Sequence, residues 1–271
     1  MRKQNLYASA AIVAVVVLLV LNHLYLVTTL WGLRVETEEM QIINIVTMGG
    51  IVAMLTLITL QAVIANPRIK GLGSGVLDWT KKPFQVIVTA IIVMAYQLGS
   101  ASLAAFGSTF EAFDNSILLN EISAPTRLLS ALLSSGSPNL ALSFYIGQSM
   151  NEEAIFTGLE FFGLQFMLML VLPMIFAAFG RRLRRGEAIV LSVAIATLIT
   201  AFTFAVFHSW AYLGIPIGEA ARNFPRYWAV FFSVFTTQII KCFLAWKDDT
   251  ILGCWIGHAM GNFIISGAWA I

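Results

Sequence analysis

Residues 150–179 read MNEEAIFTGLEFFGLQFMLMLVLPMIFAAF, an apolar stretch that is interrupted near its start by the adjacent carboxylates Glu152 and Glu153 and then by Glu160. A membrane-spanning helix needs about 20 mostly apolar residues, and this stretch exceeds that length. An ionisable group at membrane depth is costly unless it is paired or hydrated, so such groups are functional candidates by default. The stretch therefore predicts both a membrane helix and a functional site.

The rest of the chain has the same apolar character. Of its 271 residues, 59% are hydrophobic and 11% are charged, whereas a soluble domain carries about 25% charged residues. The formal net charge of +2 is too small to indicate a nucleic-acid partner. We expect an all-α, polytopic membrane protein that forms a single integral membrane domain over residues 1–271. Its N-terminal helices would occupy 1–137, and a motif-bearing core would occupy 138–271.

Hydrophobic length predicts seven spans, and an eighth is possible, around a hydrophilic intramembrane cavity. The seven stretches are residues 7–30, 41–65, 84–108, 150–179, 188–213, 226–246 and 251–271. The segment 109–149 is ambiguous, because residues 116–135 resemble a short interfacial helix interrupted by Pro125. Ser137 and Pro138 then form a good helix start, a cap followed by proline.

The distribution of Lys and Arg predicts the orientation. With the N-terminus inside, the outer side holds only four of the 16 basic residues, namely Arg34, Arg127, Arg222 and Arg226. Positive charge concentrates on the cytoplasmic side of membrane proteins. We therefore expect a protein of the plasma or cell membrane, surrounded by lipid, with a cytoplasmic N-terminus.

One predicted helix is too long for a membrane. A helix from Pro138 to Gly180 would measure about 63 Å at 1.5 Å per residue, twice the thickness of the hydrocarbon core. We expect it to break, kink or lie partly along the interface, at Gly147, Gly158, Gly163 or Pro173.

Few ionisable groups fall inside the predicted helices. They are His23, Glu152, Glu153, Glu160, His208, Lys241 and His258, with Asn262 as a polar companion. In FAVFH, Phe204 and His208 share a helix face, and in HAMGN, His258 and Asn262 do the same. Phe204 is expected to pack, Lys241 to snorkel from a helix end, and His23 to pack or snorkel. Glu160 is either a supporting partner of the site or a structural hydrogen-bonding group.

These residue types point to hydrolysis. A glutamate and a histidine can activate water, while a second histidine and an asparagine amide can stabilise the oxyanion of a tetrahedral intermediate. The same set could instead hold zinc through Glu152, His208 and His258, with water as the fourth ligand. Asn262 favours the oxyanion mechanism, because an amide is a poor zinc ligand. Both mechanisms remain open at this point. Zinc is the one cofactor that these residue types indicate.

The order EE, FxxxH and HxxxN resembles the CAAX protease and bacteriocin-processing family of intramembrane proteases, which is related to the type II CAAX prenyl endopeptidases. The likeness covers Glu152–Gly158, Phe204–His208 and Thr250–Asn262. The resemblance implies a helical membrane fold with a hydrophilic cavity. Carried over to this chain, the catalytic residues are Glu152, His208, His258 and Asn262, with Glu153, Phe204 and Thr157 as auxiliary residues.

One position departs from the family pattern. The first motif of the family usually reads EExxxR, but here the last position is Thr157. An arginine would neutralise and hydrogen-bond a carboxylate, whereas threonine offers only a hydroxyl. Either Glu153 is protonated, or another group replaces the arginine, or efficient catalysis has been lost.

The positions along the helices also raise a geometric difficulty. His258 lies about 12 Å along its helix from the inner loop 247–250, but His208 lies about 30 Å from the inner end of its helix at Glu187. A shared site therefore requires strong tilt, a break at Pro173, or a hairpin 170–195 that extends past the inner boundary of the membrane.

Three function classes follow from these patterns. The leading hypothesis is an intramembrane endopeptidase that cleaves a peptide or membrane-protein substrate within or beside the bilayer. The alternative is a non-catalytic relative that acts as a membrane scaffold, regulator or immunity factor, for which Thr157 is the supporting feature. A transporter with a carboxylate proton relay is the third, and the absence of internal repeats weakens it.

Overall fold

The computed structural model describes residue 49 and residues 83–107, 138–213 and 224–265. Within these ranges every regular element is a helix. The elements are α3 (Pro83–Gly107), α6 (Pro138–Glu152), the π-helix η1 (Glu153–Phe161), α7 (Phe162–Ala178), α8 (Arg185–Leu213), α10 (Phe224–Asp248) and α11 (Leu252–Ile265). The expected helices at 7–30 and 41–65, with His23, and the interfacial helix at 116–135 lie outside the described residues.

Three helical segments are long and apolar enough to cross a membrane. They are Pro83–Ser100, Ala141–Ala178 and Arg185–His208. They overlap the stretches 84–108, 150–179 and 188–213 that hydropathy predicted. The all-helical class is thereby confirmed, and the three apolar segments point to an integral membrane protein.

The long helix begins at Pro138, where the cap signal predicted a start, and continues to Ala178. Its apolar part, Ala141–Ala178, spans 38 residues and therefore about 57 Å. The helix changes geometry rather than breaking, because residues Glu153–Phe161 form a π-helix. This wider turn includes Gly158, one of the four candidate positions, whereas Pro173 remains inside α7. Hydropathy had placed the start of this helix at residue 150, because the first part of α6 is more polar.

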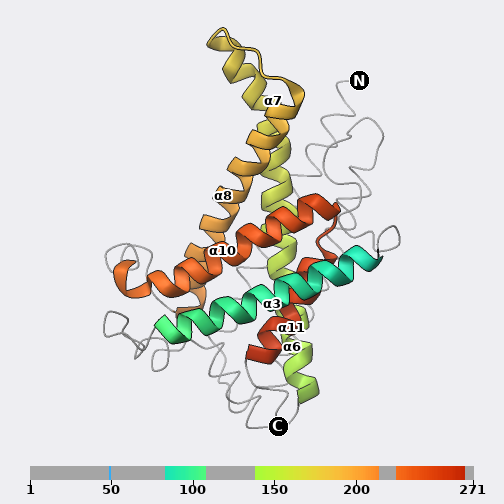
Figure 1. Cartoon of the computed structure of the whole chain (residues 1–271), viewed down its shortest axis with the longest axis vertical. Coiled ribbons are helices and arrows are strands. Elements are labelled where there is room, and N and C mark those ends of the chain that lie inside the picture. Colours follow the sequence, from blue (N-terminus) through green and yellow to red (C-terminus); the bar gives the residue numbers. More distant parts are fainter. Residues whose placement is uncertain (1–48, 50–82, 108–137, 214–223, 266–271) are drawn as a thin grey trace.

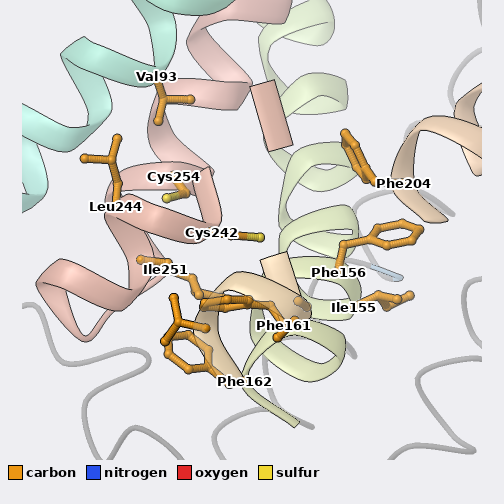
Figure 2. Packing of buried hydrophobic residues seen from close by; sticks show 14 residues of the cluster. Val93, Ile155, Phe156, Phe161, Phe162, Phe204, Cys242, Leu244, Ile251 and Cys254 are labelled. Carbon is orange, nitrogen blue, oxygen red and sulfur yellow. The ribbon is translucent and has the colours of Figure 1, made fainter. Parts of the chain in front are cut away.

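The π-helix lies at the centre of the buried core. Phe156 packs edge-to-face on Phe204 of α8, with ring centroids 4.9 Å apart, and Phe161 is fully buried. Figure 2 shows these rings beside Cys242 of α10 and Cys254 of α11, two buried free thiols. Because side chains of η1, α8, α10 and α11 meet here, the core fixes how these helices are rotated about their axes.

Helices α7 and α8 form a hairpin that projects beyond the other described helices. In Figure 1 the hairpin extends upward, while α3 and α10 cross obliquely lower down and α11 lies beside α3 and α6. The long helix and α8 thus reach well past the level of α10 and α11. A hairpin extending past the inner membrane boundary was one of the three arrangements considered for a shared site, and its depth in the membrane stays a prediction.

Helix α11 approaches α3 through a stripe of glycines at every fourth residue. A Cβ atom at Gly257 would lie 2.4 Å from the carbonyl oxygen of Ala90, and one at Gly253 would lie 2.8 Å from that of Val86. Small residues at this spacing allow helix backbones to come into contact. Gly261 instead lies against the side chain of Gln97 of α3, and a Cβ atom there would lie 2.4 Å from Gln97 Oε1. This contact fixes the position of α11, and His258 follows Gly257 directly.

We expect Gly257→Ala to lower the free energy of unfolding by about 1–3 kcal/mol, because the added methyl group forces α3 and α11 apart. The matched control is Gly163→Ala, where a Cβ atom would have no neighbour within 4 Å. Unfolding in mixed micelles of dodecyl maltoside and SDS, followed by far-UV circular dichroism, gives both values. Equal stability of the two variants would contradict the close helix contact.

Candidate functional site

Five ionisable side chains, each from a different helical element, converge on one buried site. Glu152 ends α6, Glu153 begins η1, and His208, Lys241 and His258 come from α8, α10 and α11. All but His208 are buried, and the His208 side chain is 19% exposed. The two histidines, which straight helices would have separated, both lie within 3.7 Å of Glu152 Oε2.

Glu153 is neutralised by a lysine from another helix. Lys241 Nζ forms an ion pair with Glu153 Oε1, and His258 Nδ1 lies 2.8 Å from the same oxygen. The other oxygen, Oε2, accepts a hydrogen bond of 2.5 Å from Thr157 Oγ1. The lysine ammonium also lies 4.2 Å from the centroid of the Phe204 ring, a cation–π contact. A lysine on α10 thus contacts the carboxylate at which the EExxxR pattern would have an arginine.

This role corrects our expectation for Lys241. We expected the side chain to snorkel from a helix end, but its exposed fraction is 0%. Helix α10 continues for seven residues beyond it to Asp248, about 10 Å of helix, which is too far for snorkelling to the end. The sequence did contain a signal, since Lys241 was the sole cation among the ionisable groups inside the predicted helices. A buried carboxylate without its arginine needed such a cation.

Thr157 links η1 to α10 through a second polar contact. Gln238 Nε2 donates a hydrogen bond of 3.0 Å to Thr157 Oγ1, whose own proton is directed to Glu153. Gln238 and Thr157 are both fully buried. Sequence analysis did not identify Gln238, because nothing in the sequence indicated which face of α10 meets the π-helix. The hydroxyl of Thr157 orients the carboxylate, and Lys241 supplies the charge.

The geometry around Glu152 leaves one oxygen facing both histidines. Gln148, one turn earlier on α6, donates from Nε2 to Glu152 Oε1 at 3.1 Å. Glu152 Oε2 lies 3.6 Å from His208 Nε2 and 3.7 Å from His258 Nε2. Gln148 was not singled out from the sequence, although its spacing of four residues from Glu152 places the two on one helix face.

The partners of the Nδ1 atoms determine the neutral tautomers of the histidines. His208 Nδ1 lies 2.9 Å from the carbonyl oxygen of Phe204, which can only accept, so Nδ1 carries a proton. His258 Nδ1 is closer to the Glu153 carboxylate, at 2.8 Å, than to Lys241 Nζ, at 3.3 Å, and it donates to the carboxylate. Both Nε2 atoms face Glu152 Oε2, with which they can exchange a proton.

The remaining sequence-predicted residues have separate places. Phe204 is buried and packs on the His208 ring, with centroids 4.2 Å apart, as a packing residue would. Asn262 accepts a hydrogen bond from Gln97 of α3, so its described hydrogen bond is with α3 rather than with the Glu152 cluster. Glu160 accepts a hydrogen bond of 2.6 Å from Thr203 on α8. The oxyanion role of Asn262 stays a prediction, and Glu160 has a structural partner.

The described residues do not offer a metal site. No group of three or more His, Cys, Asp or Glu side chains within those ranges is arranged to hold a metal ion. Lys241 already contacts Glu153 and lies near His258, where a second cation would be repelled. The zinc alternative therefore finds no support in this arrangement.

We expect Lys241→Met to lower the free energy of unfolding by about 3–5 kcal/mol, because Glu153 would remain buried without its counter-charge. The double variant Lys241→Met/Glu153→Gln should recover much of this loss, and a double-mutant cycle measures the coupling between the two residues. Lys247→Met, at an exposed position on the same helix, is the control and should change stability by less than about 0.5 kcal/mol. Equal stabilities of the Lys241 and Lys247 variants would refute the buried ion pair.

Comparisons with known proteins add no relative. No family model matches the chain, and neither a curated protein nor a solved structure matches it. The resemblance to the CAAX protease family therefore rests on the three motifs.

Proposed function

We propose that this protein is an intramembrane endopeptidase, similar to the CAAX proteases, that hydrolyses a peptide bond within or beside the bilayer. The observation that carries the proposal is the placement of one Glu152 oxygen between the Nε2 atoms of His208 and His258. In such an arrangement the carboxylate can act as the base that activates water. An adjacent imidazole can hold the proton and return it to the leaving group. Lys241 contacts Glu153, whereas Glu152 faces the two imidazoles.

The proposed reaction begins with a water molecule beside Glu152 and His208. Glu152 removes a proton from the water as its oxygen attacks the carbonyl carbon of the peptide. Glu152 passes this proton to Nε2 of His258, and the resulting imidazolium, stabilised by the Glu153 carboxylate at Nδ1, donates a hydrogen bond from Nε2 to the oxyanion. The carbon–nitrogen bond then breaks, and the same proton returns through Glu152, beside His208, to the leaving amine. Asn262 is the further oxyanion donor that the family resemblance implies.

Lys241 weighs against the alternative of a non-catalytic scaffold, regulator or immunity factor. That alternative depended on the loss of the motif arginine at Thr157. The ion pair between Lys241 and Glu153 supplies the same charge at the same carboxylate from α10. Lysine and arginine differ in geometry, since an arginine can bind a carboxylate through two parallel hydrogen bonds. Here Thr157 contributes the second hydrogen bond, at Oε2.

The partial exposure of His208 favours entry of the substrate from the α8 side of the site. The other four charged side chains are buried, so the peptide reaches Glu152 past His208. We further propose that the substrate is a peptide or the tail of a membrane protein. The cytoplasmic N-terminus, the location in the cell membrane and the complete set of seven to eight spans are parts of the same proposal.

The test is cleavage of a peptide library by the full chain in proteoliposomes. We expect Glu152→Gln to reduce the cleavage rate by about 10²–10⁴-fold, the usual contribution of a general acid–base group. Glu160→Gln changes another carboxylate of the same long helix and should retain cleavage, because its partner is Thr203. Circular dichroism verifies the fold of each variant. Unchanged cleavage by Glu152→Gln would refute the assigned role, and a wild type that cleaves nothing would favour the scaffold alternative.

A further inference from the structure

The turn between α7 and α8 carries four arginines within five residues. Arg181, Arg182, Arg184 and Arg185 are all exposed at the end of the projecting hairpin (Figure 1). We refer to these four residues as the basic turn. It lies apart from the Glu152 site and has no role in the proposed reaction.

Backbone hydrogen bonds hold the basic turn in one conformation. At the end of α7, Arg181 N donates to Phe176 O at 2.9 Å and Gly180 N donates to Ala177 O at 3.0 Å. Gly180 has a φ of +71°, the left-handed conformation that this helix ending requires. At the start of α8, Arg184 N donates to Glu187 Oε2 at 2.8 Å, which caps the helix. The four guanidinium groups therefore extend from a preorganised turn.

Within the described ranges, no carboxylate forms an ion pair with the basic turn. Glu187, the carboxylate nearest in sequence, accepts from the backbone. Arg184 and Arg185 also lie at the N-terminal end of α8, where the helix dipole disfavours cations. An anion lying against these two arginines would offset that cost.

The surroundings of the basic turn indicate where that anion resides. Phe179, two residues before Arg181, is 83% exposed, and Met174, seven residues before it, is 72% exposed, so large apolar side chains reach the surface next to the basic turn. Arg181 itself lies over the ring of Phe176, 5.9 Å from its centroid. Apolar side chains next to arginines match the boundary between acyl chains and headgroups of a bilayer. A soluble polyanion would match the charge but not the adjoining apolar surface.

We infer that the basic turn binds the phosphate headgroups of anionic phospholipids and anchors the α7–α8 hairpin at an anionic membrane surface. Each basic residue near such a surface strengthens the attraction by about fivefold. The inference is independent of the proposed peptidase activity, because it involves other residues and a different ligand.

The experiment measures lipid preference with the full chain in nanodiscs of phosphatidylcholine. Spin-labelled phosphatidylglycerol and spin-labelled phosphatidylcholine report how strongly each lipid associates with the protein. We expect wild type to prefer phosphatidylglycerol, and the variant R181Q/R182Q/R184Q/R185Q to lose at least about fivefold of that preference. The variant with lysine at all four positions retains the charge and should keep most of the preference. Raising the salt concentration should weaken the preference of wild type.

Two controls and three outcomes make the result decisive. Lys247→Gln removes an exposed cation elsewhere and should leave the preference intact, and circular dichroism checks the fold of every variant. An equal preference in wild type and in the four-glutamine variant would overturn the inference. Loss of the preference in the four-lysine variant would also overturn it, because charge complementarity would not be its cause. Displacement of the labelled lipid by millimolar inorganic phosphate would assign the turn to a soluble phosphate instead.

Discussion

The buried ion pair between Lys241 and Glu153 is the interaction on which the rest of the site depends. Without the lysine, the site would hold two adjacent carboxylates and a surplus of negative charge in a medium of low polarity, where charges are costly. With it, Glu153 becomes a fixed acceptor for His258 and Thr157. The ion pair also joins α10 to the π-helix across 88 residues of chain. Charge balance and helix packing are thus achieved by one contact.

Two neighbouring carboxylates take different tasks where the π-helix begins. In an α-helix, residues next to each other point about 100° apart. Here Glu152 faces the two imidazole Nε2 atoms, Glu153 faces the lysine, and His258 contacts both through its two nitrogens. The π-helix begins at Glu153, at the junction between these tasks, and such wide turns often occur at functional positions. The π-helix thus begins at the same place in the chain as the pair of adjacent carboxylates.

The sequence predicted those parts of the structure that depend on composition along a single helix. Hydropathy located α3 and α8 to within a few residues, and the cost of buried charge singled out Glu152, His208 and His258. The sequence did not identify Gln148, Gln238 or the partner of Lys241, because these contacts depend on how the helices are rotated against one another. The glycines at 253, 257 and 261 were visible as a regular spacing, yet their meaning required a facing helix. The likeness to a peptidase family rests on short motifs, so it could not foresee a cation from α10.

The glycine stripe of α11 has a consequence for how this chain divides into parts. Read as motifs, the functional unit begins at residue 138, and everything before it is an accessory. Physically, α3 sets the height and rotation of α11, since the backbones of Ala90 and Gly257 leave no room for a side chain between them. Helix α3 contributes no charged residue to the site, yet its contact with α11 determines the position of His258. The segment that carries the site residues is therefore smaller than the set of helices needed to position them.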